Sequence, residues 1–136
     1  MTILFSRVDL NKIIEHCWAE YPYEACGILA GLIRGEEKTV TRIYSTRNTL
    51  RSATRYQVDP EEQVRVFEEI EESRLDLIGF YHSHPSFTAQ PSGIDEKHAY
   101  YPEQSYVIIS LMGGEAEVRS YVWRDRFLEE AVQVVE

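Results

Sequence analysis

The feature that most constrains the fold is a short apolar segment that ends in two histidines. Leu77 to Tyr81 are apolar, aromatic or small, which is typical of a buried β-strand, and Pro85 prevents the strand from continuing. His82 and His84 stand two residues apart, so on a strand both side chains point to the same face of the sheet. The sequence therefore predicts a buried strand, Asp76 to His84, with two imidazoles at its end.

Two imidazoles on one face of a strand form half of a zinc site. Zn²⁺ prefers four tetrahedral ligands, and a catalytic site takes three from the protein and leaves one position for water. Asp95 is the third ligand that we predict. The segment from Ser92 to Asp95 is also typical of a helix start, with Ser92 as the N-cap and Asp95 in the first turn. The combination with His82 and His84 favours the metal site over the capping role alone.

The length and charge of the chain narrow the class of protein. A chain of 136 residues is long enough for one domain with a buried core. A formal net charge of −9 argues against non-specific binding to nucleic acid and to anionic membranes, because both need a positive surface. We therefore expect partners among proteins and small molecules, and no nucleic acid or membrane.

The chain shows no export signal and no membrane span. The N-terminus lacks a basic start followed by a long apolar core, and no later apolar run is long enough to cross a bilayer. Cys17 and Cys26 are too far apart for a Cys-x-x-Cys motif, and two cysteines do not make a disulfide framework. We expect a cytoplasmic protein with two free thiols.

Hydrophobic periodicity predicts two amphipathic helices. Apolar residues recur at helical spacing from Asp9 until Pro22 ends the helix, and again over residues 60–73 after the N-cap Asp59. His16 lies off the apolar stripe of the first helix, so we expect a surface histidine.

The other elements make a mixed α/β order. The predicted strands span residues 23–33, 39–44, 76–84, 106–112, 117–123 and 127–135. The last of these is expected at an edge of the sheet, and a short helix from Ser92 to about Tyr100 carries Asp95, with His98 exposed. The order predicts an α/β fold with a mixed, largely antiparallel central β-sheet flanked by helices.

Glu24 is a single acid in front of a continuous apolar run. A carboxylate at this place is either solvated at the tip of the strand or held there for chemistry. Cys26 shares a face of the predicted strand with Glu24, which allows either a thiol near the site or a simple packing role. The sequence leaves both questions open.

A basic stretch interrupts the acidic chain. Between residues 38 and 58 there is no acid, and the cationic residues are Lys38, Arg42, Arg47, Arg51 and Arg55. The stretch is either a solvated loop or a cationic rim that meets a substrate carboxylate or an acidic protein surface.

Taken together, these residues resemble the JAMM (MPN-plus) metalloprotease family. Its signature is an upstream glutamate followed by His-x-His, seven residues, Ser, two residues and Asp. Glu24, His82, His84, Ser92 and Asp95 match this signature without a gap. The resemblance covers nearly the whole chain and extends to flanking residues such as Gly79, Tyr81, Pro85 and Pro91.

The resemblance implies a cytidine-deaminase-like single domain, a JAMM/MPN-type metallopeptidase over residues 1–136. His82, His84 and Asp95 are then ligands of one catalytic Zn²⁺ with a bound water, Glu24 is the general base and Ser92 stabilises the oxyanion. The implied reaction is hydrolysis of a peptide or isopeptide bond after the C-terminal Gly-Gly tail of a ubiquitin-like or sulfur-carrier protein. Short stand-alone family members of this kind occur in bacteria and archaea.

Two other functions stay open. A non-catalytic MPN scaffold keeps the fold without the metal, but such proteins usually lack ligands that this chain has. A small-molecule zinc amidohydrolase or deaminase uses a similar metal and glutamate, but the Pro-Cys-x-x-Cys ligand pair of deaminases is absent. The sequence does not identify the modifier protein, the leaving group or the oligomeric state, a homodimer included.

Overall fold

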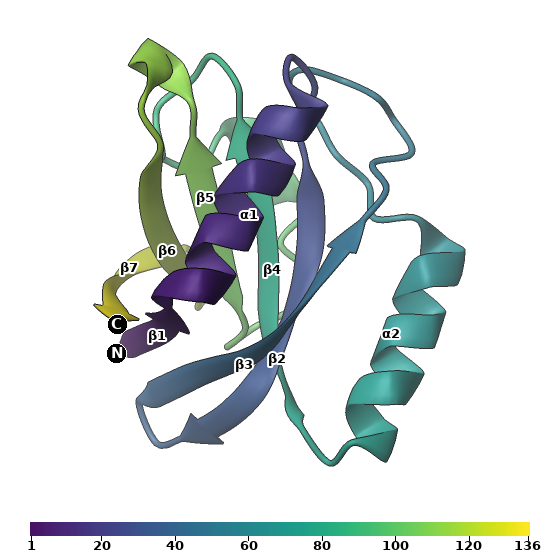
Figure 1. Ribbon diagram of the computed structural model, residues 1–136, viewed down its shortest axis with the longest axis vertical. Coiled ribbons are helices and arrows are strands. Elements are labelled where there is room, and N and C mark those ends of the chain that lie inside the picture. Colours follow the sequence, from purple (N-terminus) through teal and green to yellow (C-terminus); the bar gives the residue numbers. More distant parts are fainter.

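The chain folds around a β-sheet that closes on itself (Figure 1). The structure is a computed structural model that describes Met1–Glu136. Its strands are β1 (Thr2–Ser6), β2 (Cys26–Arg34), β3 (Glu37–Thr46), β4 (Asp76–His84), β5 (Ser105–Ser110), β6 (Glu117–Trp123) and β7 (Phe127–Val135). They lie in the order β1-β3-β2-β4-β5-β6-β7, and β1 also pairs with β7. The predicted mixed α/β fold with a central sheet is confirmed.

The closure of the sheet corrects one prediction and adds one strand. We expected residues 127–135 at an edge, but β7 pairs with β6 on one side and with β1 on the other. The first strand was not predicted, because five residues directly before a helix are too few to show a clear alternation. As Figure 1 shows, the two termini lie side by side where β1 meets β7.

The sheet is mixed, as predicted. The pairs β2–β3, β2–β4, β5–β6 and β6–β7 are antiparallel, whereas β4 is parallel to β5 and β1 is parallel to both of its neighbours. β4 and β5 approach each other closely at Gly79. A Cβ atom at this position would lie 1.9 Å from the carbonyl oxygen of Ser105 on β5, so only glycine fits there. The strand that carries the two histidines is therefore fixed between β2 and β5.

The two long helices begin where the sequence provides caps. Helix α1 (Arg7–Glu20) starts after Ser6, whose Oγ accepts a hydrogen bond from the backbone N–H of Asp9. Helix α2 (Pro60–Glu72) starts after Asp59, whose side chain accepts from two backbone N–H groups. Both predicted helices are confirmed. No helix is both long and apolar enough to cross a membrane.

The helices cover opposite faces of β2, β4 and β5. Leu10, Ile13 and Cys17 of α1 pack with residues such as Leu29 and Tyr81 in one buried cluster. On the other face, Ile70 of α2 packs with a second set that includes Ile28, Phe80 and Tyr106. The neighbouring residues Phe80 and Tyr81 of β4 thus belong to different clusters, because successive side chains of a strand point to opposite faces.

His16 is not the surface histidine that we expected. It lies half-buried on α1, and its Nδ1 is 2.7 Å from the hydroxyl oxygen of Tyr81 on β4. Burial lowers the pKa of His16, although the nearby Glu20 carboxylate opposes the shift. The apolar spacing of α1 did not predict the burial of His16. The long side chain of Tyr81 on β4 reaches His16 although His16 lies beside the apolar stripe.

A buried polar cluster joins strands that are far apart in the sequence. We call it the Lys38 cluster, and its members are Lys38, Ser105, Ser120 and Glu130. The Lys38 ammonium donates to Ser105 Oγ and to the Glu103 carbonyl oxygen, each at 2.8 Å. The hydroxyls of Ser105 and Ser120 both donate to Glu130 Oε2, at 2.5 and 2.6 Å. The first residue of the basic stretch is therefore structural and does not belong to an exposed rim.

Candidate metal centre

The end of β4 places His82 and His84 side by side on the α2 face of the sheet. Both are buried, and their Nε2 atoms lie 3.2 Å apart. Ser83, between them, points to the other face, where its Oγ accepts from Ala25 N–H and its N–H donates to the Ala25 carbonyl oxygen. The predicted strand Asp76–His84 is confirmed with the same bounds.

The helix start at Ser92 presents Asp95 to both histidines. In the short helix α3 (Gly93–Lys97), Ser92 Oγ accepts from Asp95 N–H at 3.1 Å, and Asp95 Oδ2 accepts from Ser92 N–H at 2.8 Å. The same carboxylate has Oδ1 at 3.2 Å from His82 Nε2 and Oδ2 at 3.0 Å from His84 Nε2. The two roles that the sequence left open are thus combined, because the reciprocal cap holds the carboxylate toward the imidazoles.

The hydrogen bonds of His84 show which ring atom faces the cluster. His84 Nδ1 lies 2.7 Å from the Thr88 carbonyl oxygen, which can only accept, so Nδ1 carries the proton. A neutral His84 then presents its Nε2 lone pair to Asp95 Oδ2, and two acceptors meet at 3.0 Å. A cation between them removes this mismatch.

The donor set fits zinc. The ligand atoms of His82, His84 and Asp95 all lie within 4.8 Å of one another. With Zn–N distances of about 2.0–2.1 Å, the edge of a tetrahedral site is about 3.3 Å, close to the separations of the three donors. Two imidazole nitrogens and a carboxylate oxygen are ligands that Zn²⁺ prefers. These three residues could hold one metal ion.

The electrostatics of the cluster match this role. Burial opposes ionisation of Asp95, but the two imidazoles beside it and the backbone N–H of Ser92 keep its pKa below the usual range. Burial lowers the pKa of His82, although Asp95 opposes the shift. An ionised Asp95 beside a His82 whose protonation is disfavoured suits the binding of a cation.

Glu24 lies just before β2, buried against the same site. Only 3% of its surface is exposed, and its Oε1 has no hydrogen-bond partner. Burial raises its pKa to about 9, and the charge of Asp95 adds to the shift. Glu24 and its neighbours are clamped in place, since Glu24 N–H donates to the Ser52 carbonyl oxygen and its own carbonyl oxygen accepts from Asn48 Nδ2. Of the two interpretations of Glu24, the structure excludes the solvated tip.

One pocket opens at this site, and a second pocket shares the residue Ile94 with it. The smaller, about 300 Å³, is lined by Glu24, His84 and Ser92 together with Ile94. The larger, about 560 Å³, is mostly hydrophobic and lies between α2 and α3, with Ile94 in its wall as well. The structure thus brings the carboxylate, an imidazole and the serine that we singled out to one opening.

Comparison with known proteins identifies the family. Residues 6–124 match the family described as prokaryotic homologs of the JAB domain. This chain belongs to that family. The resemblance predicted from the sequence is confirmed.

Several relatives match this JAB domain over nearly its whole length. The CysO-cysteine peptidase of Mycobacterium tuberculosis is 38% identical over 137 residues, covering 98% of this chain and 92% of the relative. The desampylase of Haloferax volcanii is 37% identical over 127 residues, covering 92% and 88%. The solution structure of protein DSY2949 from Desulfitobacterium hafniense has a TM-score of 0.89 at 30% identity and covers 98% of this chain and 93% of that one.

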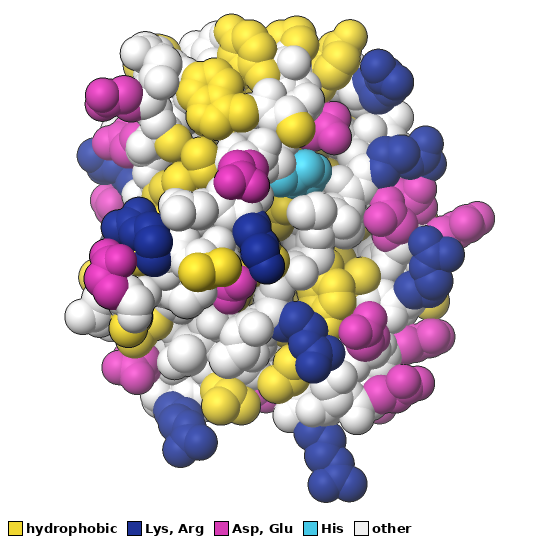
Figure 2. Space-filling model, in the orientation of Figure 1, with side chains coloured by type: hydrophobic (Ala, Val, Ile, Leu, Met, Phe, Trp, Pro, Cys, Tyr) yellow, Lys and Arg dark blue, Asp and Glu magenta, His cyan; other side chains and the backbone are white.

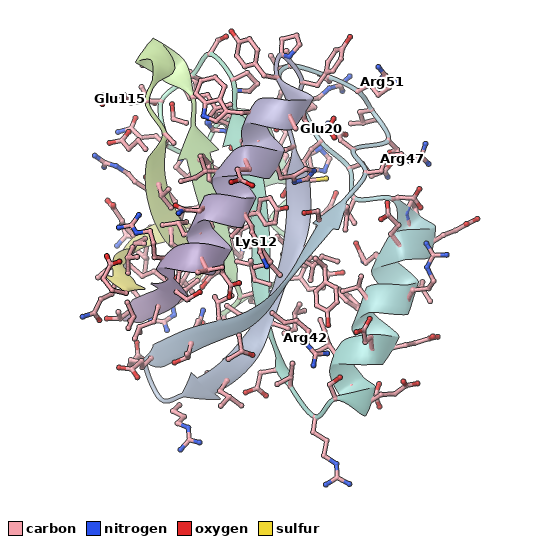
Figure 3. All side chains as sticks on the ribbon, viewed as in Figure 1. Lys12, Glu20, Arg42, Arg47, Arg51 and Glu115 are labelled. Carbon is pink, nitrogen blue, oxygen red and sulfur yellow. The ribbon has the colours of Figure 1, made fainter.

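The basic stretch of this JAB domain does not form one cationic rim. Arg42 lies beside Glu69 and donates to Ser73 Oγ, and Arg47 forms a 2.6 Å ion pair with Asp59 at the start of α2. Figure 3 shows Arg42, Arg47 and Arg51 spread from one end of α2 to the loop above it. In Figure 2 acidic and basic side chains alternate over this face.

Two residues around the JAB site, Tyr56 and Asn48, were not singled out from the sequence. The ring of Tyr56 stacks on His82 with centroids 4.5 Å apart, and Asn48 ties Glu24 to the loop that follows β3. No local sequence pattern identifies Tyr56 or Asn48, because each contacts a site residue that is more than 20 positions away in the chain. His98 is exposed, as predicted, and contacts Tyr100.

The cysteines take no part in the site. Both are free and buried, and burial raises the pKa of each thiol to about 12. Cys26 lies against Thr46, with Sγ 3.4 Å from Oγ1, and packs in the cluster on the α2 face. The packing role of Cys26 and the free thiols that we predicted are both confirmed.

Proposed function

We propose that this JAB domain is a zinc-dependent peptidase or isopeptidase that hydrolyses an amide bond after the C-terminal Gly-Gly tail of a ubiquitin-like or sulfur-carrier protein. One observation carries the proposal: the ligand atoms of His82, His84 and Asp95 converge beside Glu24, a buried carboxylate with a free oxygen. Relatives named as a CysO-cysteine peptidase and as a desampylase support hydrolase activity on such protein tails.

His82, His84 and Asp95 would hold the ion. When bound, zinc supplies a Lewis acid and lowers the pKa of a coordinated water from ~15.7 to about 7. The chain prepares this binding in advance, because the Thr88 carbonyl oxygen fixes the tautomer of His84 and the cap at Ser92 fixes Asp95.

Glu24 acts as the general base and then as the general acid. Its Oε1 is free to accept a proton, and its backbone is held on both sides by Ser52 and Asn48. In the apolar surroundings that raise its pKa, a carboxylate binds a proton readily and can pass it to the leaving amine. Beside a bound cation the pKa of Glu24 falls again, which brings it closer to the value that suits proton transfer near neutral pH.

Ser92 stabilises the developing oxyanion. Its Oγ accepts the hydrogen bond from Asp95 N–H, so the hydroxyl hydrogen stays free to donate. Ser92 lines the same small pocket as Glu24 and His84. A substrate carbonyl in this pocket can therefore lie with its oxygen toward Ser92 and its nitrogen toward Glu24.

The proposal extends to the organisation of the protein. Residues 1–136 are proposed as one JAMM/MPN-type metallopeptidase domain in the cytoplasm, with a protein tail as its partner and no nucleic acid or membrane. The wider cytidine-deaminase-like classification and a homodimer stay predictions from the sequence.

The test is a mass measurement on a protein substrate. The zinc-loaded enzyme is incubated with a small Gly-Gly-ending sulfur-carrier protein from its own organism that carries a C-terminal extension, and the intact mass is followed. We expect the extension to be released after the second glycine, and the Glu24→Gln variant to release it far more slowly. An unchanged mass with every such protein, or equal rates for the two enzymes, contradicts the proposal. Failure to bind zinc favours the non-catalytic scaffold.

A further inference from the structure

We propose that Tyr56 is a positioning residue of the metal centre: its ring holds the imidazole of His82 in the orientation that a metal ligand needs, in place of the hydrogen bond that holds His84. The rings of Tyr56 and His82 are stacked, with centroids 4.5 Å apart and an angle of 21° between their planes. The inference rests on the proposed function, because it assigns a role at the same zinc site. Tyr56 acts through His82 and is not itself among the proposed ligands.

The two histidines differ in what their outer ring nitrogen contacts. His84 Nδ1 lies 2.7 Å from the Thr88 carbonyl oxygen, which fixes the tautomer and the direction of the ring. His82 directs its Nε2 at the cluster, 3.2 Å from Asp95 Oδ1, but its Nδ1 is buried and has no hydrogen-bond partner. A metal-ligating histidine usually donates this second N–H to an acceptor. Another contact must therefore hold the ring of His82.

The orientation of an imidazole depends on a soft torsion. The wells of the torsion about the Cβ–Cγ bond are broad, so an imidazole without a hydrogen bond can rotate. A rotated His82 ring would carry its Nε2 away from Asp95 Oδ1 and from His84 Nε2, each 3.2 Å distant. Stacking on Tyr56 opposes this rotation, because the contact between two rings is lost when one plane turns against the other. The stack supplies the orientation that no hydrogen bond supplies.

The side chain of Asn48 fixes the backbone on both sides of Tyr56. Asn48 Nδ2 donates to the Arg55 carbonyl oxygen at 3.1 Å, and Asn48 Oδ1 accepts from Gln57 N–H at 3.1 Å. The same Nδ2 donates to the Glu24 carbonyl oxygen at 3.0 Å. Asn48 is buried, so water competes little for these hydrogen bonds. One amide thus places both the aromatic ring and the residue proposed as general base.

Packing alone is the simpler explanation for a half-buried tyrosine. Tyr56 does contact the hydrophobic cluster on the α2 face. In the same region Phe67, Phe80 and Tyr101 pack against one another at interplanar angles between 46° and 89°. Packing alone does not require the flatter stack of Tyr56 on the one histidine whose Nδ1 lacks a partner. That arrangement is the one that limits rotation of an imidazole.

The experiment measures the zinc affinity of the full chain by competition with a chromophoric chelator, together with the visible absorption of the Co²⁺-loaded protein. Tyr56→Leu removes the ring but keeps an apolar side chain. We expect its dissociation constant for zinc to rise about tenfold or more, because the outer contacts of a metal-bound histidine contribute about this much to affinity. Its Co²⁺ absorption should also differ from that of the wild type. Tyr56→Phe, which keeps the ring, should match the wild type in both measurements.

A matched control is Tyr101→Leu. Tyr101 is also half-buried and lines the same larger pocket, but its ring contacts Phe67 and Phe80 and no histidine. Its loss should lower the unfolding temperature of the zinc-free protein and leave the zinc dissociation constant unchanged. Wild-type zinc affinity in Tyr56→Leu, or an equal loss in Tyr56→Phe or Tyr101→Leu, would overturn the role of Tyr56 while leaving the zinc site in place. A wild type that binds no zinc would instead remove the proposed function itself.

Discussion

The metal centre and the Lys38 cluster are both buried groups of polar side chains, yet they are satisfied in different ways. In the Lys38 cluster donors meet acceptors: an ammonium and two hydroxyls point at oxygen atoms, and only Glu130 Oε1 lacks a partner. At the metal centre the lone pairs of two imidazoles and a carboxylate converge. The first arrangement pairs its donors with acceptors inside the chain, apart from Glu130 Oε1, whereas the second needs a cation.

The two clusters also differ in their access to a pocket. The metal centre adjoins the small pocket, which Glu24 and Ser92 also line. The Lys38 cluster lies on β3, β5, β6 and β7 and lines neither of the two pockets. Burial of polar groups therefore does not by itself identify a functional site; converging acceptors beside a pocket do.

The largest expected effect comes from a ligand of the metal centre. His82→Ala should lose bound zinc and reduce turnover by on the order of 10³ or more, because the ion supplies several kcal/mol to the barrier. The variant should also unfold at a lower temperature than the zinc-loaded wild type, since the ion joins β4 to α3. Metal analysis and thermal unfolding with and without chelator measure both effects. One bound equivalent of zinc in His82→Ala would remove His82 from the ligand set.

Glu24→Gln separates chemistry from metal binding. The amide keeps the size of the side chain but cannot accept the proton, so kcat should fall by about 10²–10⁴. Zinc content and the unfolding temperature should stay close to those of the wild type, because Glu24 is not among the proposed ligands. Near-normal cleavage by this variant would show that another group is the base.

The Lys38 cluster should respond in stability and leave the site unaffected. Lys38→Met removes the cation whose charge faces Glu130 in the interior and should lower the free energy of unfolding by about 3–5 kcal/mol, whereas the double variant Lys38→Met, Glu130→Leu should lose much less. Zinc content and kcat should be unchanged in both. Denaturant unfolding and metal analysis provide the readouts. If Lys38→Met loses zinc, the two clusters are coupled and the contrast between them fails.

Substitutions of Ser92 separate its role as a helix cap from its proposed role in catalysis. Ser92→Asn retains a helix cap but lacks the hydroxyl, so we expect kcat to fall by about 10²–10³ while stability is largely preserved. Ser92→Thr keeps both groups and should retain most activity. Equal activity of the Asn and Thr variants would leave Ser92 with the structural role alone.

The smallest expected effect is a pH dependence of the Lys38 cluster. Burial lowers the pKa of Lys38 below 10.5, so in the window under that value the unfolded chain binds more protons than the folded chain. The contribution of Lys38 to the free energy of unfolding should therefore rise as pH rises toward 10.5. Unfolding of wild type and Lys38→Met between pH 8 and 10.5 measures this difference in slope. Parallel slopes would show that Lys38 is not desolvated.

Much of the site followed from local patterns. The bounds of β4, β6 and β7 agree with the predicted strands, and the caps of α1 and α2 lie where the chain supplies Ser or Asp. His82 and His84 share a face because a strand has a period of two. The pairing of β1 with β7 was not predictable in this way, since it joins the two ends of the chain.

The sequence by itself determined which residues are available for chemistry and that His82 and His84 lie on a strand and Asp95 at a helix start, whereas Glu24, predicted inside a strand over residues 23–33, lies just before β2. Only the tertiary structure decided that Asp95 Oδ atoms reach both imidazoles, that Glu24 is buried beside them, and that Lys38 is enclosed by β5 and β7. Periodicity and capping are properties of neighbouring residues, whereas desolvation and the convergence of lone pairs depend on strands that pair across most of the chain.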